Sequence, residues 1–256
     1  MKLYAFHCGG DKVDLALFDP FHPDVGTKID IPFFFYLVAH PAGNVLFDGG
    51  CHKGLITDPC GRLGDIPDAY SLNLKEGDDV VSQIARISMN PEHIGHVALS
   101  HLHYDHSGAI EFFPSATFYV QRTELRFAYW PASYQATMYA RPDFEHPVQW
   151  RECSGWTDVF GDGTIVLFPT PGHTPGHQSM LVKLEHRNII LVGDAAYLPR
   201  NIELGVLPAI VWSPDAMVDS WQLIEQVRRD HDAELIFTHD PDWARKTRVA
   251  PDMWYE

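Results

Sequence analysis

The sequence predicts a layered fold of the α+β class, built from β-strands and helices. Short apolar runs of strand length recur along the chain between turn-forming residues, as expected for buried strands. Two segments, 78–89 and the one beginning at Ser213, have the apolar spacing and the N-terminal residues of amphipathic helices. Four predicted strands end directly before a side chain that can bind a metal ion, and a shared edge of the layers would bring these side chains together. They are His101, His173, Asp194 and His239.

Composition limits the class of protein. The chain has 256 residues, of which 45% are apolar, so it is long enough for a substantial core. Its formal net charge of −15 argues against binding to nucleic acids or to anionic membrane surfaces. No membrane span and no signal peptide are expected from the distribution of apolar residues. The four cysteines form no close pair and no zinc-ribbon spacing, so we expect reduced thiols in a cytoplasmic protein.

The N-terminal half is predicted to consist mainly of strands. They are expected at 2–7, 13–18, 31–39 and 45–48. The last two form a hairpin that ends in Asp48-Gly49-Gly50, a carboxylate beside two flexible residues. Leu55–Leu74 has no clear apolar period and is expected to be a loop. The helix at 78–89 has four apolar residues on one face, and Asp78 is its expected N-cap.

The C-terminal half is predicted to combine further strands with two helices. The strands are expected at 96–100, 117–121, 164–168, 178–184, 188–192 and 235–238. One helix is expected at 123–129, and another begins at Ser213, with Pro214 as its first helical residue. A segment near 130–147, rich in aromatic residues and proline, is expected to be an irregular insertion. It would form either a lid or binding wall or a packed surface loop.

The stretch 100–108 carries the strongest chemical signal. Three imidazoles and one carboxylate occur within positions 101–106, directly after an apolar strand, and Ser107 and Gly108 are expected to open a helix. Neutral imidazole nitrogens and carboxylate oxygens are the ligands preferred by zinc and its neighbours in the first transition row. A loop at a strand end can turn the first two histidines toward one point and Asp105 and His106 toward a second. The spacing therefore predicts a metal site.

The order of these motifs resembles that of the metallo-β-lactamase superfamily. The likeness runs along nearly the whole chain, from Asp48-Gly49-Gly50 through His101-x-His103-x-Asp105-His106 and Gly172-His173-Thr174-Pro175-Gly176-His177 to Gly193-Asp194 and Thr238-His239. The resemblance implies an αββα sandwich, with two mixed sheets flanked by helices and a dinuclear metal site at one sheet edge. We expect a single domain, residues 1–256, that includes the insertion near 130–147.

The resemblance also implies seven metal ligands, one of which bridges two divalent ions together with a water or hydroxide. The first ion would be held by His101, His103 and His173, the second by Asp105, His106 and His239, and the bridge would be Asp194. Zinc is the expected metal, although iron, cobalt and manganese suit the same ligand types. His177 and Asp48 are expected to support the loops by hydrogen bonds rather than to bind metal.

The stretch Gly193-Asp194-Ala195-Ala196-Tyr197 is similar to the N-acyl-homoserine lactonases, which are quorum-quenching members of this superfamily. In them a tyrosine three residues after the bridging aspartate contacts the substrate, and Tyr197 occupies that position. The likeness implies that a metal-bridging hydroxide opens the lactone ring of a small-molecule substrate. Tyr197 would stabilise the oxyanion, and Asp105 would donate a proton to the leaving ring oxygen. No Gly-x-Ser-x-Gly motif offers a serine nucleophile instead.

An acyl chain on such a substrate needs an apolar groove. We expect this groove between the N-terminal loop and the insertion, formed by Phe18, Phe21, Tyr129, Trp130, Tyr134, Met138 and Tyr139. For each of these residues a role in the plain core is the alternative. Members of the family are often dimers, so a homodimer is one of the oligomeric states that the resemblance allows, and the sequence alone does not fix the oligomeric state.

Other functions on the same scaffold stay open. One is a lactonase for a different ring, such as 4-pyridoxolactone. Another is a thioesterase of the glyoxalase II type, although the chain has few of the Lys and Arg residues that an anionic thiol substrate favours. A metal protein for redox chemistry or sensing would be expected to carry more carboxylate ligands and a flavin domain, for which the chain has no room. A nucleic-acid-processing enzyme conflicts with the net charge of −15.

Overall fold

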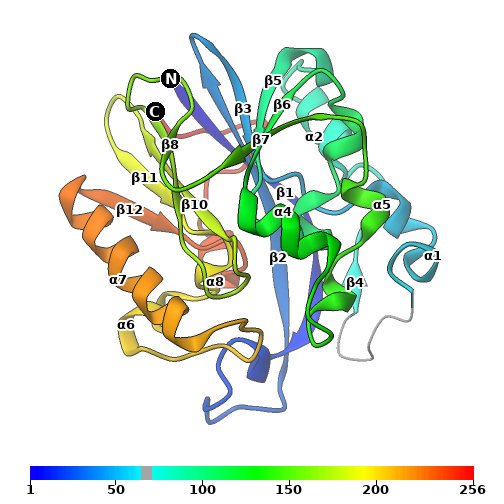
Figure 1. Ribbon diagram of the computed structural model, residues 1–256, viewed down its shortest axis with the longest axis vertical. Helices are drawn as coiled ribbons and strands as arrows, with labels where there is room; N and C mark the ends of the chain where they lie inside the picture. The colour runs from blue at the N-terminus through cyan, green and yellow to red at the C-terminus, as the bar shows by residue number, and fades with distance from the viewer. Residues whose placement is uncertain (65–70) are drawn as a thin grey trace.

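Two β-sheets pack face to face, and helices cover the outer face of each, so that four layers result (Figure 1). The computed structural model describes residues 1–64 and 71–256. The predicted αββα architecture is therefore confirmed, and both sheets are mixed, because each contains parallel and antiparallel pairs.

The first sheet has seven strands in the order β4-β1-β2-β3-β5-β6-β7. Its strands are β1 (Lys2–Asp14), β2 (Lys28–His40), β3 (Gly43–Phe47), β4 (Leu72–Asn73), β5 (Ile94–Ala98), β6 (Thr117–Gln121) and β7 (Gln149–Cys153). The second sheet has five strands in the order β12-β11-β10-β9-β8. They are β8 (Thr157–Asp158), β9 (Ile165–Pro169), β10 (Gln178–Lys183), β11 (Asn188–Leu191) and β12 (Ala233–Ile236).

Helices lie on both sides of this pair of sheets, with α7 along one side of the molecule and α2, α4 and α5 on the other (Figure 1). Their bounds are α1 (Pro59–Leu63), α2 (Val80–Ala85), α3 (Tyr104–Ser107), α4 (Arg122–Tyr129), α5 (Arg141–Phe144), α6 (Pro199–Leu204), α7 (Pro214–Asp230) and α8 (Pro241–Ala244). The Ser213 side chain accepts a hydrogen bond from the Ala216 N–H and caps α7, as the Ser-Pro pair predicts.

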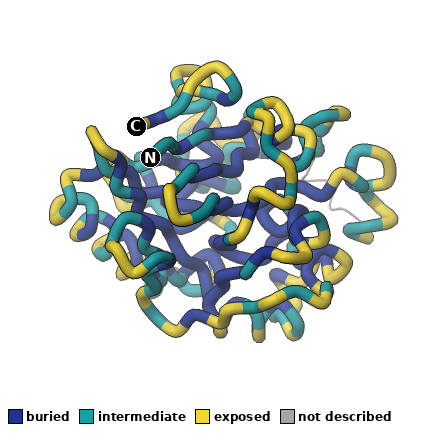
Figure 2. Tube along the Cα trace, turned by 90° about the horizontal axis from the view of Figure 1, so that it is seen from above, coloured by how far each residue is buried: buried dark blue, intermediate teal, exposed yellow. Residues whose placement is uncertain are grey.

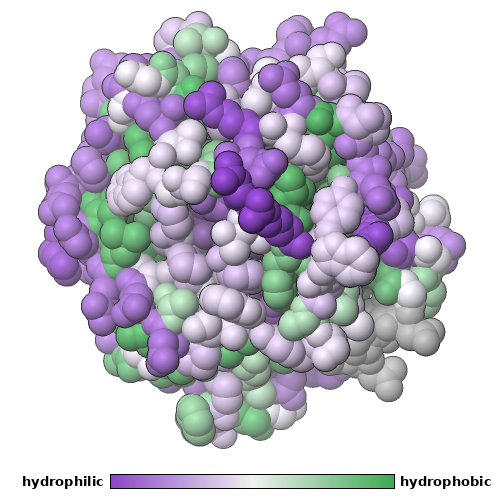
Figure 3. All heavy atoms as spheres, viewed as in Figure 1, coloured by the Kyte–Doolittle hydropathy of each residue, from purple (hydrophilic) through white to green (hydrophobic). Residues whose placement is uncertain are grey.

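The buried apolar residues form three core clusters, and the alternation of side chains along the strands of the first sheet separates two of them. In β2, Phe33 and Phe35 face the outer helices, whereas Phe34 and Tyr36 face the second sheet. A third cluster lies between the second sheet and the apolar face of α7. Figure 2 shows these buried segments running through the middle of the molecule, with exposed loops around them. On the face seen in Figure 3, polar residues are interspersed with smaller groups of apolar ones. Within the described residues, no helix is both long and apolar enough to cross a bilayer.

Several predicted boundaries are wrong. The expected second strand at 13–18 is the end of β1 followed by a 3-10 helix, Leu15–Leu17. Ser107 and Gly108 do not open a helix, because α3 begins at Tyr104 and ends at Ser107. The N-cap of α2 is Asp79, whose carboxylate accepts from the Ser82 N–H at 3.1 Å.

The expected loop at 55–74 contains the short elements α1 and β4. Positions 65–70 of that range lie outside the described residues.

Close backbone packing joins the turn after β3 to the segment after α3. The Gly49 N–H donates to the His106 carbonyl and the Gly108 N–H to the Gly50 carbonyl, both at 2.9 Å. A Cβ atom on Gly108 would lie 2.0 Å from the backbone nitrogen of His52, which leaves no room for a side chain. Glycine is therefore required here by space and not by an unusual backbone angle, since its φ is −64°.

We predict that Gly108→Ala lowers the free energy of unfolding by about 1–3 kcal/mol, because the backbone at 50–52 must move to accept the methyl group. Gly95→Ala is the matched control, since a Cβ at Gly95 would meet nothing within 4 Å. Urea denaturation of the two variants and the wild type measures the difference. A loss in Gly108→Ala no larger than that in Gly95→Ala would contradict this packing argument.

Candidate metal centre

Five strands end at the same edge of the two sheets, and each is followed by a residue of one buried cluster. Asp48 follows β3, His101 follows β5, His173 follows β9, Asp194 follows β11 and His239 follows β12. The side chains of the cluster follow strands of both sheets, and the first and last of them, Asp48 and His239, lie more than a hundred residues apart in sequence. All seven predicted ligands are brought together in it, and they form three overlapping groups whose ligand atoms lie within 4.8 Å of one another: His101, His103, His173; His101, His106, Asp194; Asp105, His106, His239.

The first group consists of three imidazoles with facing nitrogen atoms. His173 Nε2 lies 3.2 Å from His101 Nε2 and 3.0 Å from His103 Nδ1. A tetrahedral zinc ion at its usual distance from nitrogen separates its ligand atoms by about 3.3 Å. Hydrogen bonds occupy the other nitrogens of two of these rings, since Nδ1 of His101 lies 2.9 Å from Ser100 Oγ and Nδ1 of His173 lies 3.3 Å from the Ile210 carbonyl. The three nitrogens thus have the spacing and orientation that one metal ion needs.

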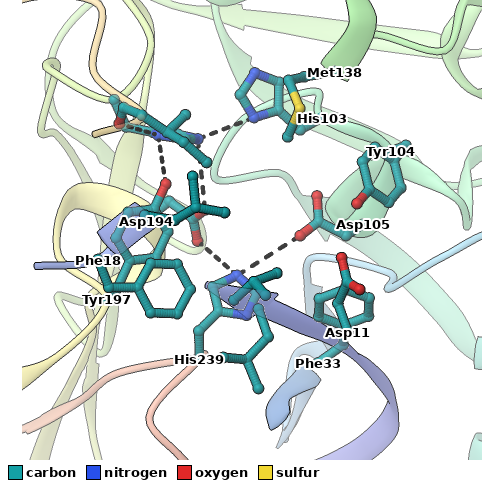
Figure 4. Close-up of a pocket in the computed structure, with 15 residues that line it drawn as sticks. Asp11, Phe18, Phe33, His103, Tyr104, Asp105, Met138, Asp194, Tyr197 and His239 are labelled. Carbon is teal, nitrogen blue, oxygen red and sulfur yellow. Dashed lines mark hydrogen bonds and ion pairs between the residues drawn. The ribbon is translucent and has the colours of Figure 1, made fainter. Parts of the chain in front are cut away.

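The second group contains Asp105, His106 and His239. The Nε2 atoms of His106 and His239 lie 3.5 Å and 3.7 Å from Asp105 Oδ2. His239 donates from Nδ1 to the Pro32 carbonyl at 2.9 Å, which leaves its Nε2 free to bind an ion. Figure 4 shows Asp105, Asp194 and His239 directed toward one another.

Asp194 lies between the two groups. Its Oδ1 is 3.3 Å from His106 Nε2 and 3.1 Å from His239 Nε2, whereas its Oδ2 is 3.5 Å from His173 Nε2. Each carboxylate oxygen therefore faces a different group, which is the arrangement that a bridging carboxylate requires.

The cluster fits divalent cations for two reasons. Buried polar atoms are normally hydrogen-bonded, yet His106 Nε2 and Asp194 Oδ1 have no hydrogen-bond partner within the described chain. Burial, reinforced by neighbouring imidazoles, lowers the pKa of His101 and His103 well below the ordinary value, so both rings are neutral and can offer a lone pair.

The charges in the second group also favour a bound cation. Burial disfavours the charged form of His106, but Asp105 and Asp194 raise its pKa well above the ordinary value. The pKa of His239 is raised in the same manner, against burial, mainly by Asp194. The carboxylates thus attract positive charge to the point where an ion would bind.

Three buried side chains hold the candidate ligands in place. Asp48 accepts from the Ser100 N–H at 2.7 Å and from Ser100 Oγ at 2.9 Å, and its Oδ2 lies 2.9 Å from His106 Nδ1. His177 Nδ1 lies 2.9 Å from Thr170 Oγ1, and its Nε2 accepts from the Asp194 N–H at 2.9 Å. Burial lowers the pKa of His177 to about 3, so this imidazole is neutral, as its acceptor role requires.

Glu124 is the third of these side chains, and the sequence analysis did not identify it. Its carboxylate accepts from the Leu102 N–H at 3.0 Å, from the Thr174 hydroxyl at 2.6 Å and from the Tyr139 hydroxyl at 3.0 Å. It therefore ties the loop that carries His103 to the loop that carries His173. A glutamate in an amphipathic helix gives no sign in the sequence that it is buried.

A cavity opens on the cluster, and Tyr197 forms part of its wall. The Tyr197 hydroxyl lies 3.0 Å from His173 Nδ1, and its ring stacks on Phe18 with centroids 4.3 Å apart. Of the seven residues expected to form an apolar groove, Phe18 and Met138 line this cavity. Its other apolar walls come from Val13, Leu17, Ile31, Phe33 and Ile210.

The remaining five expected groove residues do not line the cavity. Phe21, Trp130 and Tyr134 are exposed to solvent, with 88%, 83% and 64% of their surface accessible. Tyr129 packs edge-on against Phe144. Tyr139 is buried behind His103 with its hydroxyl on Glu124. Of the expected groove residues in the insertion, which contains the short helix α5, Met138 alone lines the cavity as described.

The comparisons with known proteins agree with this geometry. A sequence model described as the metallo-beta-lactamase superfamily matches residues 34–239. The N-acyl homoserine lactonase AttM of Agrobacterium fabrum is 39% identical over 235 residues, which span 90% of this chain and 89% of that protein. AiiA of Bacillus thuringiensis subsp. kurstaki, also an N-acyl homoserine lactonase, is 27% identical over 89% of this chain and 88% of its own.

A solved structure extends the likeness to the whole fold. An N-acyl homoserine lactone hydrolase with the product N-hexanoyl-L-homoserine at its catalytic metal centre superposes with a TM-score of 0.89 at 25% identity. The match covers 99% of this chain and 98% of that one. From its four layers, its buried cluster at the strand ends and these relatives, it follows that the chain belongs to the metallo-beta-lactamase superfamily, in the family of N-acyl homoserine lactonases.

Proposed function

We propose that this enzyme hydrolyses the ring ester of N-acyl-homoserine lactones with two divalent metal ions, of which zinc is the first candidate. The buried cluster of facing imidazoles and carboxylates supports the metal requirement. The relatives that share its fold and up to 39% of its sequence support the substrate. Bound divalent ions would polarise the ester carbonyl and lower the pKa of coordinated water, which is the usual route to a nucleophile at neutral pH.

The candidate ligands divide into the two groups described above, with Asp194 between them. His101, His103 and His173 would hold one ion, and Asp105, His106 and His239 the other. Since these residues come from both sheets, we further propose that residues 1–256 act as a single domain. Separating the sheets would separate the ligands.

Tyr197 would position the substrate carbonyl. If His173 binds an ion through Nε2, its Nδ1 carries a proton and donates to its neighbours, which include the Tyr197 oxygen at 3.0 Å. The phenol then accepts at its oxygen and keeps its own proton to donate. A donor aimed at the developing oxyanion stabilises the transition state more than the ground state.

Asp105 would supply the proton that the ring oxygen needs on leaving. Its side chain is 11% exposed, lies in the cavity wall and faces the His106 and His239 nitrogens. A carboxyl group in this place can pass a proton between water and the leaving alkoxide.

We expect the purified protein to open the ring of N-hexanoyl-homoserine lactone, to lose this activity in a strong chelator and to regain it with added Zn²⁺. Chromatography of the ring-opened acid measures the activity. The metal content of the same preparation is measured by elemental analysis. Full activity in protein that has been stripped of metal would refute the proposed function, as would inactivity of the fully loaded protein on acyl-homoserine lactones of every chain length.

Tyr197→Phe is expected to lower kcat/KM by roughly 100-fold, because one donor to the oxyanion is lost. The metal content should stay at the wild-type value, since the Tyr197 hydroxyl lies beside His173 Nδ1, the nitrogen that faces away from the ion. Steady-state kinetics and elemental analysis of the same preparation test both points. A variant that loses metal would show instead that the phenol serves to hold His173.

Asp48→Asn is expected to weaken metal binding by roughly 10- to 100-fold, because the amide cannot accept from all three groups that the carboxylate serves. Competition with a chromogenic chelator measures the affinity. The control is Asp30→Asn, which removes an equal charge from a side chain that is 74% exposed. Equal affinities in the two variants would exclude this role for Asp48.

A further inference from the structure

The wall of the cavity contains a buried carboxylate that neither the metal ligands nor the reaction uses. Asp11 is 2% exposed and lines the same cavity as Asp105 and His239. It belongs to none of the three groups of candidate ligands. Figure 4 shows its carboxylate on the side of the cavity where that of Asp105 lies.

A β-bulge turns Asp11 into this cavity. Before the bulge, Phe6 faces the outer core cluster, and the odd-numbered Leu3 and Ala5 face the second sheet. The register of β1 against β2 then shifts between His7 and Gly10, where Gly9 has a φ of +99°. After the shift Asp11 pairs with Ile31, and both side chains lie in the cavity wall. One extra residue therefore reverses the two faces of the strand, which is how bulges redirect side chains beside active sites.

One oxygen of Asp11 is already occupied. Oδ1 accepts from the Ser71 N–H at 2.5 Å and from the Lys12 N–H at 2.7 Å. These two bonds hold the carboxylate in one orientation, and no hydrogen bond to Oδ2 is formed by the described residues. The residue is 2% exposed, so a donor on a bound ligand would replace the few water contacts that Oδ2 can make. The described wall of the cavity contains no Lys or Arg that could serve.

We propose that Asp11 accepts a hydrogen bond from the amide N–H of the substrate and so selects N-acyl-homoserine lactones over lactones that lack this donor. The inference rests on the proposed function. The amide nitrogen is bonded directly to the lactone ring, beside the carbonyl that reacts, and it is the one donor in an unsubstituted acyl-homoserine lactone. Asp11 lines the same cavity as Tyr197 and Asp105, which are assigned to the reacting ester, and its carboxylate lies on the side of Asp105. Apolar residues form other parts of the cavity wall, along which the acyl chain can extend.

The test compares N-hexanoyl-homoserine lactone with its ester analogue, in which oxygen replaces the amide nitrogen. In Asp11→Asn, the two backbone N–H groups keep the amide oxygen on their side and turn the NH₂ group toward the cavity. An acceptor at that position thus becomes a donor. The loss of a hydrogen bond to a charged group lowers a binding constant or a rate by about 10- to 100-fold. We therefore expect the amide-to-ester ratio of kcat/KM, measured as ring-opened product, to fall by about that factor.

Controls separate this inference from the proposed function. Asp30→Asn removes the same charge outside the cavity and should leave the ratio unchanged. Because both substrates meet the same folded, metal-loaded fraction, the ratio is insensitive to partial unfolding. Should Asp11→Asn fail to fold, Asp11→Ser replaces it, since its small hydroxyl can accept from the same N–H groups.

The outcomes are distinct. If the wild type opens both rings and the ratio in Asp11→Asn stays within about twofold of the wild-type value, the role of Asp11 is refuted and the lactonase function stands. If the wild type opens neither ring, the proposed function fails, and this inference fails with it. A ratio that falls in Asp11→Asn but not in Asp30→Asn supports the assignment.

Discussion

The whole site depends on the attraction between buried lone pairs and positive charge. Imidazole nitrogens of His101, His103 and His173 face one another at 3.0–3.2 Å, and Asp194 points a carboxylate oxygen at each of the two groups. Such groups repel one another or remain unsatisfied unless cations lie between them. The surrounding fold acts as a frame: its contacts hold these groups in place before any ion binds.

The frame is built from backbone contacts that tolerate no side chain and from carboxylates that accept several hydrogen bonds. Asp48 adopts a left-handed φ of +61° at the end of β3, which directs its carboxylate to Ser100 and His106. A strained backbone conformation of this kind persists where many surrounding contacts hold it, often at functional sites. Glu124 has the same function on the other side of the cluster, where it joins two ligand loops. Rigid support matters because misplaced ligands weaken metal binding.

The motifs shared with the metallo-β-lactamase superfamily predicted the architecture and the set of candidate ligands. Clear apolar strand patterns predicted in addition that His101, His173, Asp194 and His239 follow strand ends. The walls of the cavity could not be predicted in this way. Phe21 and Trp130 are aromatic and lie in irregular segments, but only tertiary packing decides that they face solvent. Asp11 depends on the bulge at Gly9, where one extra residue exchanges the two faces of β1. The pair Gly9-Gly10 within a strand is the one sign of such a bulge in the sequence. Glu124 has no comparable sign.

Two cations are expected to lie at the shared edge of the two sheets. Anomalous X-ray diffraction from crystals of zinc-loaded protein, collected on both sides of the zinc absorption edge, tests this expectation most directly. Two peaks are expected roughly 3.5–4 Å apart, as in other two-metal sites. One should lie among His101, His103 and His173, the other among Asp105, His106 and His239, with Asp194 between them. A single peak, or peaks away from these side chains, would contradict it.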